Sequence, residues 1–172
     1  MATPLHFSHQ TPTPTDPTTT ASHNLALQTF DSIASFDPPS WQRRLDSEDA
    51  RLFTATSSTP INTETPDNNP NPVKAFLLTS RRQHLELPLP TLHISLAAVD
   101  PSHRGQGLFP RLLAMVEVYA REELGLGGVT ICTLPERFPG MFRLLREGRN
   151  GWVEVRGTET GDGTKVLFWR GC

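Results

Sequence analysis

The sequence predicts an α/β fold in which a mixed central sheet of about seven strands is flanked by about four helices. In the shorter apolar segments, apolar residues alternate with polar ones, which is the period of a strand. In the longer segments, apolar residues recur three and four positions apart, which is the period of an amphipathic helix. Glycine and proline separate most of these segments and mark the connections between them.

The first quarter of the chain predicts one strand and two helices. Residues 5–9 alternate as a strand does, and residues 10–22, which include the run TPTPTDPTTT, predict a flexible loop. A helix is expected from Ser22 to the stop at residues 37–39, and Ser40 is expected to cap a short helix that ends at Leu45. The apolar side of the first helix consists of Leu25, Leu27, Phe30, Ile33 and Phe36.

The middle of the chain predicts three strands, at residues 51–56, 73–79 and 92–99. Residues 57–72 are dense in Pro, Asn, Thr and Asp, so they predict a long flexible hairpin loop. The strand at residues 92–99, the fourth of the chain, ends at Asp100-Pro101, because a proline biases the residue before it away from the helical conformation.

The last part predicts a long helix, a strand, a helix and a final hairpin. The long helix has an apolar stripe made of Phe109, Leu112, Leu113, Val116, Ala120 and Leu124. Residues 129–134 predict a strand, and Pro135-Glu136 is expected to open a helix that ends near Gly148. Residues 151–156 and 165–170 predict two strands joined by a turn at Glu159–Gly163.

A glycine-rich turn, Arg104-Gly105-Gln106-Gly107-Leu108, joins the strand at 92–99 to the long helix. The first turn of a helix leaves backbone N–H groups unpaired and carries the positive end of the helix dipole. Glycines allow the backbone to approach an anion closely, and Arg104 adds a positive charge. Pro110 falls in the first helical turn, where its missing N–H costs little. These features predict a phosphate-binding site.

Two common phosphate-binding motifs are excluded, because the turn lacks both the Gly-Lys-Ser/Thr of a P-loop and the third glycine of a dinucleotide fingerprint. The longer string VDPSHRGQGL, from Val99 to Leu108, resembles the acyl-CoA signature of the GNAT superfamily of N-acetyltransferases. The order of the predicted elements also agrees with that family. The resemblance implies a single GNAT domain over residues 1–172, with the fourth and fifth strands splayed around the pantetheine arm of the cofactor.

The resemblance also implies which residues bind acetyl-CoA. The pyrophosphate would be held by backbone amides of Arg104, Gly105, Gln106, Gly107, Leu108 and Phe109, with the Arg104 side chain nearby. The strand edge formed by Ala97, Ala98 and Val99 would pair with the pantetheine amides. The Ala97 amide would donate to the acetyl carbonyl as negative charge develops on its oxygen. Thr133 would bond to the pantetheine where the family often has Asn.

Acetyl transfer needs a neutral amine, so a base must take a proton from the acceptor. We expect His93 to be this base, because it lies six residues before Val99, where histone-type relatives carry a Glu. The alternative is that His93 is a hydrogen-bonded residue of the pocket wall. Glu86 is a second candidate base, and Ser95 is expected to line the pocket.

The sequence departs from the family pattern at three positions. Phe109 replaces the usual small residue and could narrow the pyrophosphate site, and Thr133 or Leu134 replaces the Asn. Phe142 lies in the region where many members have a Tyr that protonates the leaving thiolate, and Tyr119 is expected to be a packing residue. The sequence thus predicts an acetyl-CoA-dependent N-acetyltransferase acting on a primary amine of a small molecule, peptide or protein. The alternatives are a catalytically weak or inactive acyl-CoA-binding protein and an interaction scaffold.

The composition narrows the partners and the location. The 16 Lys and Arg residues against 18 Asp and Glu give a net charge of −2, which argues against a nucleic-acid-binding protein. Cys132 and Cys172 lie far apart and no Cys/His cluster has metal spacing, so no metal site is expected. No apolar run has membrane length and no targeting segment is recognised. We therefore expect a cytoplasmic or nucleocytoplasmic monomer or homodimer without membrane partners.

Overall fold

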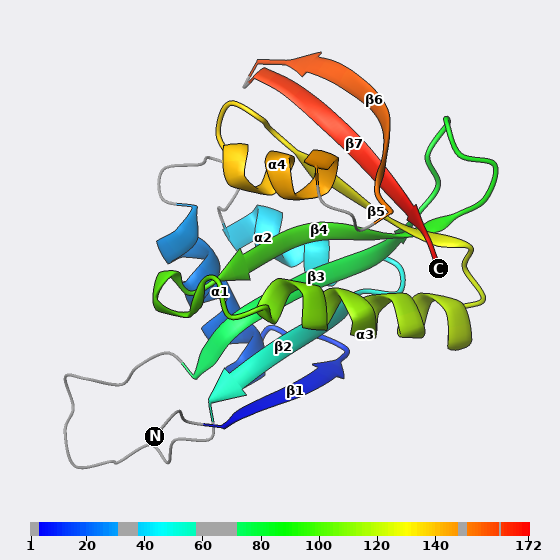
Figure 1. Cartoon of the computed structure of the whole chain (residues 1–172). Coiled ribbons are helices and arrows are strands. Elements are labelled where there is room, and N and C mark those ends of the chain that lie inside the picture. The colour runs from blue at the N-terminus through cyan, green and yellow to red at the C-terminus, as the bar shows by residue number, and fades with distance from the viewer. Residues whose placement is uncertain (1–3, 31–37, 58–71, 148–150, 162) are drawn as a thin grey trace, which may run out of the picture. The chain divides into compact units, whose positions relative to one another are not determined.

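The computed structural model describes residues 4–30, 38–57, 72–147, 151–161 and 163–172. Within these residues the strands form one mixed sheet in the order β1-β2-β3-β4-β5-β7-β6, and four α-helices accompany it (Figure 1). The predicted architecture of about seven strands and about four helices is confirmed. The elements are β1 (Leu5–Gln10), α1 (Pro17–Thr29), α2 (Pro38–Leu45), β2 (Arg51–Ser57), β3 (Val73–Arg82), β4 (Thr91–Val99), α3 (Leu108–Glu122), β5 (Gly128–Thr133), α4 (Pro139–Glu147), β6 (Val153–Thr160) and β7 (Gly163–Gly171).

The contacts of the chain divide it into two compact units. Unit 1 consists of Met1–Ser80 and Leu96–Met115, and unit 2 consists of Arg81–Ser95 and Val116–Cys172. Three elements, β3, β4 and α3, begin in one unit and end in the other. The expectation of a single domain over residues 1–172 stays a prediction.

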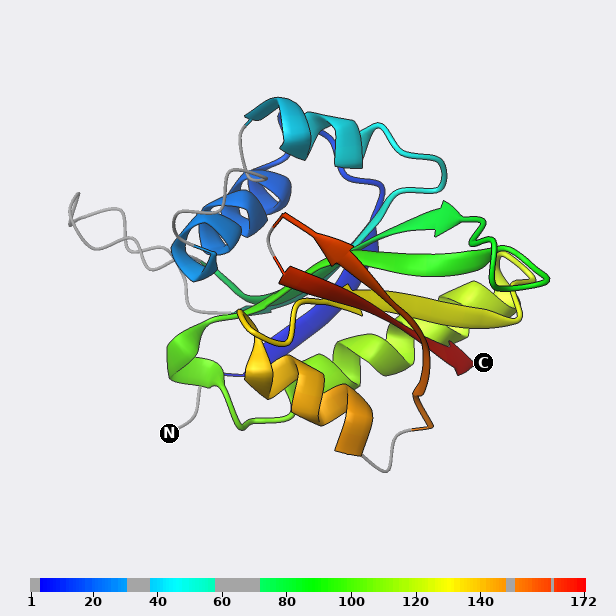
Figure 2. The same cartoon turned by 90° about the horizontal axis from the view of Figure 1, so that it is seen from above.

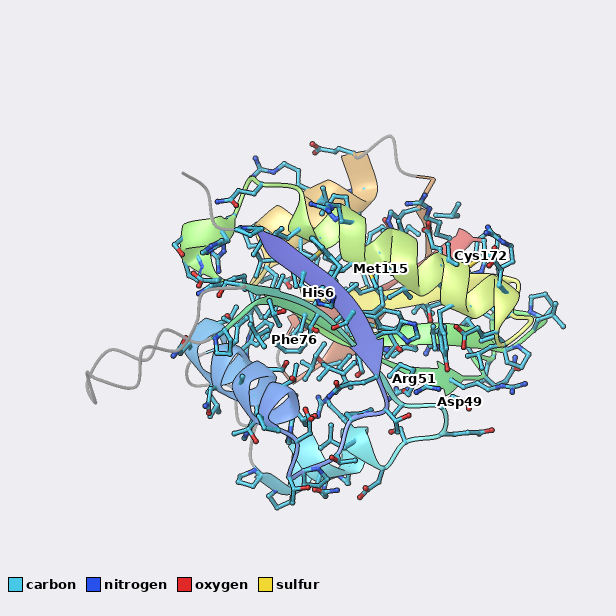
Figure 3. All side chains as sticks on the ribbon, turned by 90° about the horizontal axis from the view of Figure 1, so that it is seen from below. His6, Asp49, Arg51, Phe76, Met115 and Cys172 are labelled. Carbon is cyan, nitrogen blue, oxygen red and sulfur yellow. The ribbon has the colours of Figure 1, made fainter. Side chains whose placement is uncertain are left out.

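Unit 1 is built on the antiparallel strands β1, β2 and β3 and on helices α1 and α2. Its core is a cluster of buried apolar residues that includes Leu25, Leu45, Leu52, Phe76, Leu78, Leu96 and Ala98. Trp41 belongs to this core, since its ring stacks on His23 with 4.7 Å between centroids and meets the edge of Phe76. Figure 3 shows Phe76 labelled on β3 and His6 on β1.

Helix α1 begins at Pro17, so the prediction of a loop over residues 10–22 is wrong for its second half. Asp16 is the N-cap, and its Oδ1 accepts a hydrogen bond from the Thr19 amide at 2.8 Å. Pro17 takes the first helical position, where a proline needs no donor. The cap and the proline together override the weak helix propensity of the threonines that follow.

Helix α2 begins at Pro38, so the prediction of Ser40 as its N-cap is also wrong. Ser40 lies inside the helix, where its hydroxyl accepts a hydrogen bond from Arg43 Nη2 at 2.7 Å. Among the described residues other than glycine, Asp49 has a positive φ, of 53°. It lies in the turn just before Arg51 and β2 (Figure 3). The expected helical residues Ile33 and Phe36 and most of the predicted loop 57–72 lie outside the described residues.

In unit 2, β7 pairs antiparallel with both β5 and β6 (Figure 2). Strand β4 pairs parallel with β5 only where Leu92, His93 and Ile94 face Val129, Thr130 and Ile131. β4 continues to Val99 and β5 to Thr133, so the two strands part beyond this short paired segment. This is the splay predicted between the fourth and fifth strands.

Two boundaries in unit 2 differ from the prediction. Helix α4 begins at Pro139 rather than at Pro135, because a tight turn intervenes in which the Phe138 amide donates to the Leu134 carbonyl at 2.8 Å. The final hairpin is longer than expected, since Thr160 and Gly163 still pair and the predicted turn over Glu159–Gly163 is correspondingly shorter. The predicted helix end at Gly148 lies outside the described residues.

Candidate cofactor and catalytic site

The glycine loop, defined here as residues 104–109, lies in unit 1 and leads from β4 into α3, as the sequence predicts. Gly105 and Gly107 have φ values of +76° and +73°, which residues with a Cβ atom rarely adopt. A Cβ at either position would meet no described atom within 4 Å. The two glycines are therefore needed for backbone conformation, and the space beside them is open.

The end of the glycine loop is also the start of α3. The Arg111 amide donates to the Gly107 carbonyl at 3.2 Å, so Gly107 closes the first helical turn. The amides of Leu108 and Phe109 precede any helical acceptor, and Pro110 has no amide hydrogen. Residues 104 to 107 are exposed. A helix start with unpaired amides, two left-handed glycines and an adjacent arginine is suited to bind an anion.

Hydrogen bonds attach the segment before the glycine loop to β3 within unit 1. The Asp100 amide donates to the Lys74 carbonyl at 2.8 Å, and Lys74 Nζ lies 3.9 Å from Asp100 Oδ2. Asp100 Oδ1 accepts from the amide and the hydroxyl of Ser102, at 2.9 and 2.7 Å. Burial raises the pKa of the Asp100 carboxyl, but Ser102, His103 and Lys74 outweigh it, so this pKa lies below its ordinary value.

Phe109 is only 8% exposed and Leu108 only 2%, so both side chains are in the interior. The phenyl ring is thus withdrawn from the exposed part of the loop, although the sequence had raised the concern that it narrows the pyrophosphate site. Arg104 Nε lies 3.4 Å from the Val99 carbonyl, at the end of β4. One turn into α3, the Arg111 guanidinium lies 3.9 Å from the centroid of the Phe7 ring.

The predicted pantetheine-binding edge is the end of β4. Ala97 and Val99 are half-buried, whereas Ala98 is 3% exposed and belongs to the core of unit 1. This alternation places Ala97 and Val99 on the opposite side of the strand from Ala98. Thr133, the other predicted pantetheine contact, is 5% exposed and ends β5 in unit 2.

The candidate base His93 lies in unit 2, in a buried cluster of two threonines and two histidines that we call the Thr130 cluster. His93 is 4% exposed, and its Nδ1 lies 3.1 Å from Thr130 Oγ1. The same oxygen lies 3.0 Å from Thr91 Oγ1 and 3.1 Å from His84 Nε2. The rings of His84 and His93 are 5.3 Å apart. The hydrogen bond shows that His93 is part of a polar network, as the alternative interpretation expected, and leaves its role as a base a prediction.

Sequence reasoning missed His84 and Thr130. His84 follows β3 in a connecting segment with no periodic pattern, and Thr130 meets His93 only through the parallel register of β4 and β5. Burial lowers the pKa of His84, and Arg82 lowers it further. The signal available in the sequence was a histidine in the segment before the predicted fourth strand and a threonine within the predicted fifth strand.

The structure also shows the contacts or burial of the other residues considered for catalysis, Glu86, Tyr119 and Phe142. The Glu86 carboxylate pairs with the guanidinium of Arg156, and its role as a base stays a prediction. Tyr119 is buried as predicted, and Phe142 packs edge-on against Phe168 with 5.9 Å between centroids.

No group of three or more potential metal ligands occurs among the described residues. In the part of the chain that the structure describes, no helix is both long and apolar enough to cross a membrane.

Comparison with known proteins identifies the family. The model of the acetyltransferase (GNAT) family matches residues 27–141. Among solved structures, the ribosomal-protein-S18-alanine N-acetyltransferase of Escherichia coli has a TM-score of 0.64 at 16% identity, with 96% of this chain and 94% of that chain covered. NAA60 of Arabidopsis thaliana, in complex with a bisubstrate analogue, has a TM-score of 0.66 at 13% identity, with 96% and 98% covered.

The NatC complex bound to Gag peptide and CoA has a TM-score of 0.67 at 12% identity, with 98% of each chain covered. At these identities the structures show the shared fold. No curated protein matches the chain in sequence. The family model covers most of the chain, including the glycine loop and β4, and the fold agrees with it. The chain therefore belongs to the GNAT acetyltransferase family.

Proposed function

We propose that the protein is an N-acetyltransferase that transfers the acetyl group of acetyl-CoA directly to a primary amine. The observation that carries this proposal is the glycine loop, in which two left-handed glycines precede a helix start in a chain of the GNAT family. The fold shared with one N-acetyltransferase and with a complex bound to CoA supports the same proposal.

The residues of the glycine loop fit the pyrophosphate of CoA. The backbone amides of residues 105–109 would provide donors at the positive end of α3. The Arg104 amide, which the sequence had also suggested as a donor, is bonded to the Pro101 carbonyl at 3.4 Å, so Arg104 would contribute the charge of its side chain. The open space at both glycine Cβ positions leaves room for close approach of an anion. Ala97, Ala98 and Val99 would offer strand-like hydrogen bonds to the pantetheine arm, and Thr133 a further one.

When bound, acetyl-CoA supplies a thioester carbonyl that an amine can attack. The Ala97 amide would donate a hydrogen bond to the carbonyl oxygen, which becomes more negative during attack. His93 would accept the proton of the amine, directly or through water. Because Phe142 cannot donate a proton, the leaving thiolate would take one from water. The thiol pKa is low enough for this to occur without a dedicated acid.

Cofactor binding is tested by melting temperatures with and without acetyl-CoA for the wild type, Arg104→Ala and Arg121→Ala. Arg121 is the matched control, since it lies near the other end of α3 and pairs with Glu122 at 2.9 Å. Saturating ligand should stabilise the wild type and Arg121→Ala, by about 2.7 kcal/mol at a hundredfold excess over Kd. Arg104→Ala should lose most of this effect. An unstabilised wild type would overturn the cofactor assignment and favour the scaffold.

Catalysis is tested separately with mass spectrometry on a panel of small amines, lysine peptides and free peptide N-termini. An increase of one acetyl group that depends on acetyl-CoA would support the enzyme. A thermal shift without acetylation of any acceptor would favour the inactive acyl-CoA-binding alternative. We propose that the protein acts in the cytoplasm or nucleocytoplasm. We also propose that it is a monomer or a homodimer.

A further inference from the structure

The Thr130 hydroxyl is saturated with hydrogen-bond partners. Its oxygen lies within 3.1 Å of three polar atoms: Thr91 Oγ1, His84 Nε2 and His93 Nδ1. A hydroxyl donates one hydrogen bond and accepts two. Full pairing of this buried oxygen therefore requires that one partner accepts from Thr130 and the other two donate to it.

When the Thr91 hydroxyl is one of the two donors to Thr130, this stoichiometry couples the tautomers of the two histidines. If Thr130 donates to His84 Nε2, His93 must donate from Nδ1, and its Nε2 then carries the basic lone pair. If Thr130 donates to His93 Nδ1, the proton of His93 is on Nε2 and the base is blocked. The state of His84 thus decides whether His93 can accept a proton at Nε2.

The residues of the Thr130 cluster differ in burial, so one side of the cluster is closer to solvent than the other. Thr130, Thr91 and His93 are 0%, 2% and 4% exposed, whereas His84 is half-buried. A proton that reaches His93 needs a route to solvent, and the hydrogen bonds of Thr130 provide one that leads to His84. We propose that Thr130 and His84 form a proton relay for His93, in which His84 is the solvent-side acceptor. The proposal rests on the proposed function, because the relay serves His93 as the base.

The relay step conserves atoms and charge. The proton of the acceptor amine goes to His93 Nε2 while the Nδ1 proton of His93 goes to Thr130 Oγ1. The proton that Thr130 held goes at the same time to His84 Nε2. The net result is a neutral His93, an unchanged Thr130 and a protonated His84, which releases a proton to water.

The charges around His84 favour its neutral, accepting state before the step. Besides His93 on β4, the groups that act on it are Arg82 on β3, Glu86 in the segment between β3 and β4, Arg156 on β6 and Lys165 on β7. Three of the four ionic groups are cations, and Glu86 is paired with Arg156. Arg82, Arg156 and Lys165 also act on Cys132 of β5. Burial and these cations lower the pKa of His84, so its protonated form favours release of the proton, as a relay requires.

The relay can be tested without any substrate by ¹⁵N NMR of the histidine rings in the full chain. In the wild type, His93 should be protonated at Nδ1, and its tautomer should change as His84 titrates. Thr130→Val should remove this coupling and shift the His93 tautomer ratio, while Thr130→Ser should keep both. Thr54→Val is the control for burying a valine in place of a threonine, because Thr54 is 1% exposed and its hydroxyl lies 3.2 Å from Ser8 Oγ, outside the Thr130 cluster.

Activity provides the second readout. In Thr130→Val and His84→Gln we expect kcat to fall at least tenfold, with KM for acetyl-CoA within twofold of the wild type, and the acidic limb of the pH profile to move. An unchanged His93 tautomer in both variants would overturn the relay. A wild type that shows the NMR coupling but acetylates no amine would keep the relay and reject the proposed function. An active wild type whose kcat is unaffected in both variants would overturn the relay alone.

Discussion

At the scale of single residues, the site depends on conformation at some positions and on burial at others. Gly107 is required by its φ of +73°, and its Cβ position is open. Phe109, two residues later, is 8% exposed, so a buried side chain holds the start of α3. The loop backbone can therefore be exposed to an anion while the helix that follows it is held by core packing.

The requirement at Gly107 predicts a measurable strain. Gly107→Ala places an L-residue in the left-handed region, which costs roughly 1–2 kcal/mol. The free energy of unfolding, measured with urea, should fall by this amount and the affinity for acetyl-CoA should fall with it. The cost is conformational, because the added methyl group meets no described atom within 4 Å.

Gly140→Ala is the matched control for Gly107→Ala. Gly140 also has an open Cβ position, but it lies in the first turn of α4 and its φ is not positive. Alanine should therefore raise stability by about 0.5–1 kcal/mol at this position. Equal effects of the two substitutions would contradict the conformational explanation.

At the scale of elements, the boundaries show which signals sequence reasoning used and which it missed. The strand at residues 92–99 and the long helix were predicted almost to the residue, because their periodic patterns are long and a proline or glycine ends each of them. The start of α1 was missed, since the run of threonines and prolines looked like a loop and the cap at Asp16 was not weighed. In such a segment the start of a helix depends on one capping side chain, and the composition of the segment does not reveal it.

The N-cap of α1 gives a direct test. Asp16 accepts from the Thr19 amide and from Gln10 Nε2, at 2.8 and 2.7 Å. Asp16→Ala removes both bonds and should destabilise the protein by about 1 kcal/mol in urea unfolding, whereas Asp16→Asn should retain most of the cap. Asp46→Ala, at an exposed residue that bonds to Gln42 in the last turn of α2, should change stability by less. Similar losses for Asp16→Ala and Asp46→Ala would argue against the cap.

At the scale of the whole molecule, the glycine loop was predictable and the Thr130 cluster was not. The residues of the loop are adjacent in sequence, so their identity and order predict an anion-binding turn. This turn lies between β4 and α3, where it was expected. The cluster unites residues from three segments through the register of β4 and β5, which no local pattern encodes. The turn between β4 and α3 could therefore be predicted from one segment of the sequence, while the partners of His93 required the fold itself.

Asp100 links the loop to the pH dependence of the whole fold. Its pKa is below the ordinary value of 3.8 in the folded protein, because Ser102, His103 and Lys74 outweigh the effect of burial. Folding therefore favours the carboxylate, and the unfolded chain takes up the proton first as the pH falls. The stabilising contribution is complete above 3.8 and is lost as the pH falls through the lower pKa of the folded state.

Asp100→Asn should accordingly be less stable than the wild type at neutral pH, and the difference should shrink as the pH falls below the ordinary value of 3.8. Urea unfolding at a series of pH values gives this difference directly. The exposed Asp46→Asn serves as the control for removing one carboxylate, and its difference from the wild type should stay small throughout. A difference for Asp100→Asn that is unchanged between neutral and acidic pH would mean that the loss of hydrogen-bond geometry, and not of charge, destabilises the segment before the glycine loop.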